Sequence, residues 1–229
     1  SAGFHSFNGD LIFGYPLLSD DKLEANLKYM IDYGVNHLST YSMTVEKGTA
    51  LEFGIRKGKE KPMYEGQAER QYRFIMLWLR EKGWDHYEVS NFCKPGKPSI
   101  HNASYWSGAP YLGIGPSAHG FDGKERYWNL ANNAGYLKQM QQGQLPEERE
   151  VLSATDRYNE FLMTRLRTAK GIQREECEAL FGSGSFLKVQ HQINSPELRP
   201  YFHSNATSLS LNEEGFLLAD YLISELFEV

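Results

Sequence analysis

The stretch Asp10-Leu11-Ile12-Phe13-Gly14-Tyr15-Pro16 begins the pattern that decides the fold. Its short apolar run ends at a Gly-x-Pro sequence, which indicates a buried strand followed by a turn. Ser19 suits the N-cap of the next helix, because the apolar residues that follow recur at helical spacing as far as Gly34. A second strand is expected over residues 37–43, so the chain opens with a strand, a helix and a strand.

The same alternation continues to residue 89. A helix is expected over residues 65–82, ended by Gly83, and a third strand over residues 84–89. This order with short connections predicts right-handed βαβ units, a parallel sheet and an α/β fold class. Because a closed barrel typically needs eight strands, the sheet is either small and open or part of a larger barrel. The N-terminus, which has no initiator Met, favours part of a barrel.

The rest of the chain divides into two parts that differ in composition and periodicity. Residues 90–121 are dense in His, Asn, Gly and aromatic residues without regular periodicity, which is typical of a long structured loop. From about residue 155 helical spacing returns, and helices are expected up to Leu166, over Arg174–Phe181 and over Glu213–Phe227, with a strand at Ser208–Leu211. This order predicts a small α-rich module that resembles a winged helix.

Composition excludes several classes of protein. The chain has 229 residues, of which 41% are hydrophobic and 23% charged, as in ordinary globular proteins. Its two cysteines, Cys93 and Cys177, lie far apart, which excludes a disulfide-stapled scaffold and an iron–sulfur cluster held by three or four thiolates of this chain. The net charge of −5 without a basic stripe argues against nucleic acid. The absence of a long apolar run and of a signal peptide, with low cysteine usage, favours a cytoplasmic protein without a membrane span.

Two positions are candidates for ligand contact from their chemistry alone. The His101 imidazole suits haem iron or another transition metal, and Asn102 and Tyr105 could hydrogen-bond the ligand or orient the ring. The alternative is a loop histidine that satisfies backbone carbonyls, which a single histidine favours. The Asp10 carboxylate could receive a ribose hydroxyl or an amine, or could simply cap a turn at Asn8-Gly9.

Other positions leave two interpretations open. The run Gly113-Ile114-Gly115-Pro116 lacks the third glycine and the lysine of a phosphate loop, so its glycines more simply allow close backbone approach to a strand or a ligand. His119 is open between ligand contact and packing. Glu46 and Glu88 lie near strand ends, where ligand crevices form but exposed carboxylates are also common. An aromatic set could build a flat pocket for a planar ligand or could pack in the core: Tyr105, Trp106, Tyr111, Phe121, Tyr127 and Trp128.

Several motifs follow one another in a fixed order, at residues 10–16, 38–49, 86–92, 95–96, 99–102, 105–106 and 111–115. Together they resemble the oxygen-independent coproporphyrinogen III oxidase-like family of radical S-adenosylmethionine (SAM) proteins. The H-N-x-x-Y element at His101, Asn102 and Tyr105 resembles the haem chaperone (HemW-like) branch, in which it is associated with haem binding. Residues 17–19 depart from the family's Gly-Gln-Thr-like stretch, which implies a variable surface detail.

The resemblance also implies roles and an architecture. Asp10 matches a family aspartate that contacts SAM, and Thr44 and His119 fall near further SAM-pocket positions. Residues 1–125 are expected to be the C-terminal part of a partial (β/α)6 radical-SAM barrel with a haem-associated loop. Residues 126–152 are expected to be a linker with a connecting helix, and residues 153–229 the family's winged-helix-like domain. The family's C-x-x-x-C-x-x-C motif is absent, so the [4Fe–4S] ligands are expected upstream of Ser1, with no cluster ligand in this chain.

The function implied by this resemblance is a haem chaperone that binds haem and SAM and passes haem to an acceptor protein. The alternative is an oxidase that converts coproporphyrinogen III to protoporphyrinogen IX by radical oxidative decarboxylation. A third hypothesis, a protein- or nucleic-acid-binding module, rests on the winged-helix-like tail, and the acidic charge argues against nucleic acid. Because an incomplete barrel exposes a sheet edge, self-association is also expected.

Overall fold

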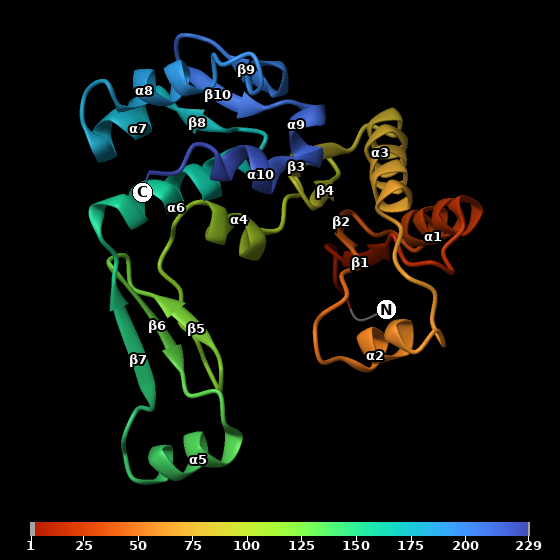
Figure 1. Cartoon of the computed structure of the whole chain (residues 1–229), viewed down its shortest axis with the longest axis horizontal. Helices are drawn as coiled ribbons and strands as arrows, with labels where there is room; N and C mark the ends of the chain where they lie inside the picture. Colours follow the sequence, from red (N-terminus) through yellow and green to blue (C-terminus); the bar gives the residue numbers. More distant parts are fainter. Residues whose placement is uncertain (1–2, 229) are drawn as a thin grey trace. The chain divides into compact units, whose positions relative to one another are not determined.

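The structure, a computed structural model, describes residues 3–228 except for the side chain of Glu65. It consists of two compact units that divide between Ile100 and His101 (Figure 1). The first unit is α/β, as predicted, and the second is built from helices and two small antiparallel sheets. No described helix is long and apolar enough to cross a membrane.

The first unit contains an open four-stranded sheet in the order β1-β2-β4-β3. β1 and β2 pair in parallel, as expected, but β4 lies antiparallel between β2 and β3. The prediction of a wholly parallel sheet was therefore wrong, and residues 91–93, expected to lie in the loop over residues 90–121, form a strand instead. The elements are β1 (Asn8–Phe13), α1 (Asp20–Asp32), β2 (His37–Ser42), α2 (Ala50–Arg56), α3 (Glu65–Glu81), β3 (Asp85–Glu88) and β4 (Asn91–Cys93).

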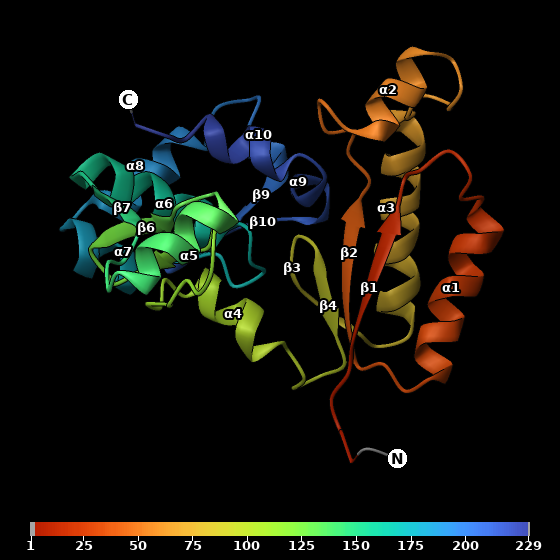
Figure 2. The same ribbon diagram turned by 90° about the horizontal axis from the view of Figure 1, so that it is seen from below.

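Helices α1 and α3 cover one face of this sheet (Figure 2). Leu11 and Phe13 of β1 are buried on that side, and the Phe13 ring stacks on Tyr72 of α3 with centroids 5.9 Å apart. Because side chains alternate along a strand, Asn8, Asp10 and Ile12 lie on the opposite face. The helix boundaries follow the predicted signals, since the Ser19 hydroxyl accepts from the Lys22 amide and Gly34 adopts a positive φ of 83°.

The second unit begins within a helix and continues into an arm. Figure 1 shows the antiparallel sheet β5-β6-β7 extending to helix α5 at its tip. The prediction that residues 90–121 form one loop was wrong, because α4 and β5 lie within them. Residues 126–152, expected to be a linker, contain two strands as well as the expected helix. These elements are α4 (Ile100–Trp106), β5 (His119–Phe121), β6 (Glu125–Asn129), α5 (Asn133–Gln141) and β7 (Glu147–Val151).

The remainder of the second unit packs helices around a three-stranded antiparallel sheet in the order β8-β10-β9. The predicted α6, α7 and β10 are confirmed, but the predicted tail helix is two helices separated at Leu218, and α8 was not predicted. The Ser153 side chain caps α6 with Asp156 in a capping box. The elements are α6 (Ala154–Leu166), β8 (Ile172–Gln173), α7 (Arg174–Phe181), α8 (Ser185–Gln192), a 3-10 helix (Arg199–Tyr201), β9 (Phe202–Ser204), β10 (Ser208–Leu211), α9 (Glu213–Leu217) and α10 (Ala219–Ser224).

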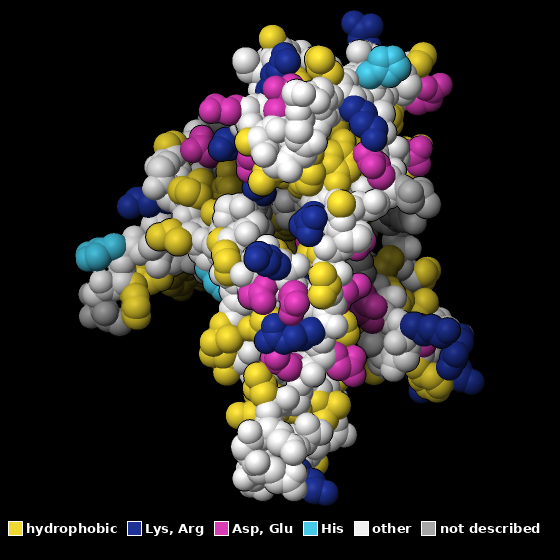
Figure 3. Space-filling view, turned by 90° about the vertical axis from the view of Figure 1, so that its left-hand side faces the viewer, with side chains coloured by type: hydrophobic (Ala, Val, Ile, Leu, Met, Phe, Trp, Pro, Cys, Tyr) yellow, Lys and Arg dark blue, Asp and Glu magenta, His cyan; other side chains and the backbone are white. Residues whose placement is uncertain are grey.

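Charged side chains of both signs are interspersed on the face that Figure 3 shows. On the arm, Arg149 lies within 4 Å of three carboxylates, those of Asp122, Glu125 and Glu147. Such local pairing neutralises the cation rather than presenting it to a phosphate backbone.

Candidate functional site

Asp10 lies in the middle of β1, on the sheet face that the helices leave open. Its carboxyl group is exposed, and its Oδ1 accepts a hydrogen bond of 2.7 Å from the Asn8 side chain. Asn8 itself pairs with His37 in the parallel ladder, so residues 8–10 form a strand and not a turn. The alternative in which Asp10 caps an Asn8-Gly9 turn was therefore wrong, and the carboxylate remains available to a ligand.

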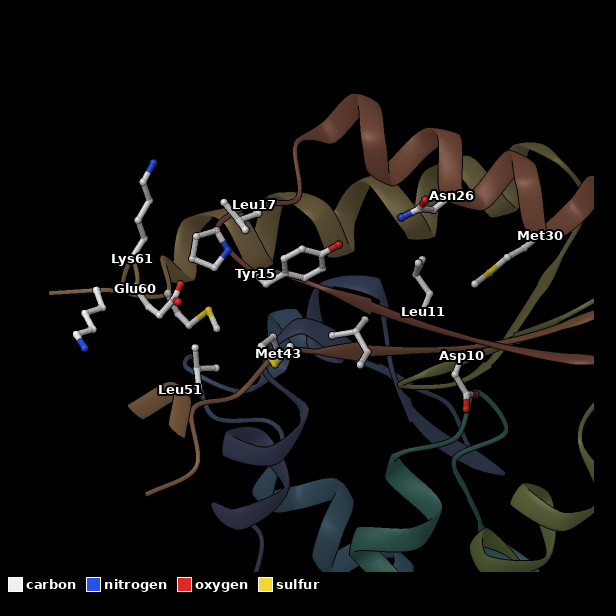
Figure 4. Close-up of a pocket in the computed structure, with 14 residues that line it drawn as sticks. Asp10, Leu11, Tyr15, Leu17, Asn26, Met30, Met43, Leu51, Glu60 and Lys61 are labelled. Atoms are coloured by element: carbon white, nitrogen blue, oxygen red, sulfur yellow. The ribbon is translucent and has the colours of Figure 1, made fainter. Parts of the chain in front are cut away.

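A cavity of about 760 Å³ extends from Asp10 past the end of β1. Its size falls in the range of small-molecule sites. Figure 4 shows Asp10 at one end and Lys61 at the other, with apolar side chains between them. Three methionines from different segments contribute to this lining, Met30 of α1, Met43 after β2 and Met63 before α3. The cavity thus offers apolar surface to a flat or flexible group and charged groups at both ends.

Two glutamines on α3 fix the loop that closes this cavity. The Gln71 Oε1 accepts from the Gly14 amide at 2.9 Å, and its Nε2 donates to the Leu18 carbonyl at 2.8 Å. One turn earlier, the Gln67 Nε2 donates to the carbonyls of Tyr15, at 2.9 Å, and of Leu18, at 3.0 Å. Sequence reasoning missed both glutamines, although two amides four residues apart beside an apolar helix face are a usable signal.

Thr44 and His119, the other predicted SAM-pocket residues, lie in different units. Thr44 follows the end of β2, is exposed, and donates its hydroxyl to Glu46 at 3.3 Å. His119 begins β5 in the second unit, where its exposed ring lies 6.3 Å from that of Trp128. A shared pocket that includes Asp10 stays a prediction.

Glu88 has a structural place. It is fully buried, so the alternative of an ordinary exposed carboxylate was wrong for this residue. Its Oε2 accepts from the Ser90 amide at 3.0 Å and from the Asn91 side chain at 2.5 Å. These bonds hold the turn between β3 and β4, so Glu88 is not available to a ligand at the sheet edge.

The H-N-x-x-Y element lies on helix α4. The prediction of a haem-associated loop was therefore wrong in its local structure. His101 and Tyr105 are four residues apart, so they share one helix face, and their rings meet edge to face with centroids 5.0 Å apart. Asn102 lies next to His101 on the same helix and is partly buried. The His101 side chain is exposed, which leaves its imidazole accessible to a ligand.

The ring array continues beyond the motif to β5. Tyr105 packs edge to face on Tyr111 with centroids 4.9 Å apart, and Tyr111 lies 6.4 Å from Phe121. The backbones of Tyr111 and Phe121 exchange two hydrogen bonds of 2.8 and 2.9 Å. Four rings from three segments thus form one contiguous aromatic surface that begins at His101.

The other predicted aromatic residues do not join this surface. Trp106 lies under the Arg167 guanidinium, and Tyr127 is buried beneath Gly120. Trp128 lies beside the His119 ring and donates its Nε1–H to Glu148 at 3.1 Å. The six aromatic residues therefore lie in separate environments and do not form one flat pocket.

The Gly113-Ile114-Gly115 run approaches a neighbouring strand, which was one of the two alternatives left open. A Cβ at Gly113 would lie 2.4 Å from the His119 carbonyl oxygen, so no larger residue fits. Gly115 has a φ of 97°, in the region that favours glycine. The buried Asn129 side chain donates to the carbonyls of Gly113 and Gly115 at 3.3 and 2.8 Å.

Residues 3–228 contain no set of ligands for a metal cluster. Within that part of the chain, no group of three or more His, Cys, Asp or Glu side chains is placed to hold a metal ion. Cys93 and Cys177 are both buried, and burial raises the pKa of each thiol above its usual value. Because the thiolate is the form that binds iron, these two cysteines are poor ligands.

Comparison with known proteins gives consistent relatives, although no family model matches the chain. The haem chaperone HemW of Mycobacterium tuberculosis is 34% identical over 191 residues, which cover 80% of this chain and 49% of that protein. HemW of Lactococcus lactis is 30% identical over 96% of this chain and 58% of the relative. HemW of Escherichia coli is 29% identical over 98% of this chain and 58% of the relative. The chain thus spans about half the length of the curated relatives it matches.

A solved structure shares the fold. The structure described as coproporphyrinogen III oxidase (HemN) from Escherichia coli, a radical SAM enzyme, superimposes with a TM-score of 0.76 over 98% of this chain and 55% of that one, at 16% identity. At that identity the likeness concerns the fold alone. The relatives in sequence and the neighbour in structure agree, and the chain belongs to the HemW haem chaperone and HemN-like radical SAM family.

Proposed function

We propose that this chain is part of a haem chaperone that binds haem through helix α4 and SAM beside Asp10. The observation that carries the proposal is the accessible imidazole of His101 at the end of an aromatic array. The [4Fe–4S] cluster of the family would be held by residues outside these 229. The described residues do not fit such a cluster, so no step of the proposal passes through it.

The geometry of α4 fits a haem group. A histidine imidazole is a common axial ligand of haem iron. The edge of the Tyr105 ring restrains the rotation of the His101 ring, and a fixed ring is a better ligand than a mobile one. Tyr111 and Phe121 extend the apolar surface on which a planar macrocycle would lie. In this proposal His101 contacts the iron, and Asn102 and Tyr105 support it.

The cavity at Asp10 is large enough for SAM, a nucleoside with a flexible tail that carries a sulfonium group. The Asp10 carboxylate would accept from ribose hydroxyls or from an amino group, and the apolar lining would contact the base. For Thr44 and His119, a role in binding SAM rests on the resemblance in sequence alone. In this proposal the residues of this chain bind and orient SAM.

The proposal extends to the architecture. Residues 1–125 would belong to a partial (β/α)6 barrel, residues 126–152 would connect, and residues 153–229 would form a winged-helix-like domain. The element order α6, β8, α7, α8, β9, β10 supports the last of these assignments. The protein would act in the cytoplasm and deliver haem to an acceptor protein.

A second candidate function is the oxidase reaction on coproporphyrinogen III. The fold shared with the HemN structure favours it. The complete protein that carries this chain, reconstituted with its cluster and supplied with SAM, a reductant and coproporphyrinogen III, would then form protoporphyrinogen IX. If the protein binds haem but forms no protoporphyrinogen IX, the result favours the chaperone function over the oxidase function.

The test is a haem titration of the 229-residue chain followed at the Soret band. His101→Ala is expected to weaken binding about tenfold or more, because the iron ligand is lost, a change of ~1.4 kcal/mol or more. His191→Ala removes another exposed histidine of the second unit and is the matched control, with an expected affinity equal to wild type. Equal affinity of all three proteins refutes the role of His101.

A further inference from the structure

A chain of hydrogen bonds connects Asp10 to the interior of the first unit, on the open face of the sheet. The Asn8 Nδ2 lies 2.7 Å from the Asp10 Oδ1, and the Asn8 Oδ1 lies 2.6 Å from the His37 Nδ1. On the other side of the ring, the His37 Nε2 lies 2.6 Å from the Tyr87 hydroxyl. The Ser39 hydroxyl also donates to the Asn8 Oδ1, at 3.2 Å. Four side chains of β1, β2 and β3 thereby form one continuous path.

The carboxylate fixes the direction of every bond in this path. An ionised carboxylate only accepts, so the amide nitrogen of Asn8 must face Asp10 and its oxygen must face His37. That oxygen in turn requires a proton on the His37 Nδ1. In a neutral ring the Nε2 then accepts, and the Tyr87 hydroxyl donates to it. One tautomer of His37 satisfies all of the groups at once.

Burial supports the neutral form of both rings. His37 is only 2% exposed, and desolvation lowers its pKa below the usual value, more than the charge of Asp10 raises it. Desolvation also raises the pKa of Tyr87 to about 12, so the phenol keeps its proton at neutral pH. Cys93 of β4 lies opposite His37 in the ladder, and burial raises the pKa of its thiol, so it keeps its proton as well.

We propose that Asn8, His37 and Tyr87 are positioning residues that orient the Asp10 carboxylate toward its ligand, with His37 held in the Nδ1–H tautomer. This inference rests on the proposed role of Asp10 in binding SAM. Asp10 is itself exposed to solvent, whereas Asn8 bonds both the carboxylate and a buried ring. The buried His37 and Tyr87 side chains therefore restrict the orientations that the exposed Asp10 carboxylate can adopt.

The first measurement is nitrogen–proton correlation NMR of the chain labelled with 15N. The wild-type spectrum is expected to show His37 as a single tautomer protonated at Nδ1. Tyr87→Phe removes the donor to Nε2, and its spectrum is expected to show a mixture of tautomers. Tyr29→Phe, which removes a phenol hydroxyl from an exposed residue of the same unit, is the control and leaves the His37 signals unchanged. A wild-type ring protonated at Nε2 alone overturns the proposal.

The second measurement is SAM affinity in the complete protein that carries this chain. Tyr87→Phe is expected to weaken SAM binding about three- to tenfold, the range of one hydrogen bond, while Tyr29→Phe binds as wild type does. If wild type binds SAM and Asp10→Asn weakens it but Tyr87→Phe does not, the positioning role is overturned and the proposed function stands. If wild type does not bind SAM, the proposed function is overturned and the positioning role falls with it.

Discussion

Replacing Gln71 by Met tests whether the loop between β1 and α1 is held by the side chains of α3. Gln71 is buried, and its side chain accepts a hydrogen bond from the Gly14 amide and donates one to the Leu18 carbonyl. Methionine has a similar length and volume and suits a helix, so the substitution removes the polar atoms without opening a cavity. The loop that lines the Asp10 cavity then loses two of the four hydrogen bonds that Gln67 and Gln71 make to its backbone.

The magnitude follows from the two backbone groups that the variant leaves without Gln71. A buried polar group without a partner costs about 1–3 kcal/mol. Gln67 still donates to the Leu18 carbonyl at 3.0 Å, so that group keeps one bond and only the Gly14 amide is fully orphaned. The expected loss in the free energy of unfolding is therefore about 2 kcal/mol, with the Gly14 amide as its main source.

The assay is urea unfolding of wild type and variant, with hydrogen exchange of the Gly14 amide as the local readout. Gln141→Met replaces an exposed glutamine of α5 and controls for the change of residue type. The variant is expected to lower the midpoint with little change in slope and to speed exchange at Gly14. A free energy within ~0.5 kcal/mol of wild type, with unchanged exchange, refutes this account of the loop.

Three further predictions concern pH, packing and association. Desolvation lowers the pKa of His86 to about 4, so between pH 6.5 and 4 the unfolded chain binds more protons than the folded chain. Acidification from pH 6.5 to 4 is therefore expected to lower the free energy of unfolding of the first unit by about 3 kcal/mol, and a urea midpoint that rises on acidification contradicts this. Gly120→Ala places a Cβ 1.9 Å from the Tyr127 ring and is expected to cost about 1–3 kcal/mol, and an unchanged melting temperature rules out this contact. β1 is an edge strand with Ile12 exposed, so the apparent mass in sedimentation is expected to rise with concentration and to rise less for Ile12→Lys; a constant 26.2 kDa contradicts it.

Local patterns are enough to predict the first half of the fold. β1, α1, β2 and α3 each have their own periodicity and end signals, and Ser19 and Gly34 act as their positions predict. β4 is different, because it has three residues and pairs with both β2 and β3. It is a strand because it pairs with residues that are distant in the chain, and such pairing leaves no pattern in the local sequence.

Helix α4 shows why the candidate site was predicted in its residues but not in its shape. Its sequence, Ile100–Trp106, is rich in residues of low helix propensity, so composition favoured a loop. The end of the helix is held by Arg165 of α6, which donates to the carbonyls of Trp106 and Ser107. That contact spans 59 residues and is invisible in the local sequence.

The polar path from Asp10 to Tyr87 was also beyond sequence reasoning. Asn8, His37 and Tyr87 come from three strands, and only the pairing of the sheet brings them together. Each residue type alone has many common uses. The chemistry of Asp10 was predicted from resemblance, and its support was visible only in the structure.

The ligand of the haem iron is the central claim, and chemical rescue tests it most directly. Ferric haem added to the wild-type chain is expected to give the Soret band of a histidine-ligated iron. His101→Ala is expected to lose that band and to regain it when free imidazole is added, because the small molecule replaces the missing ring. A His101→Ala spectrum that equals wild type without imidazole would contradict the account.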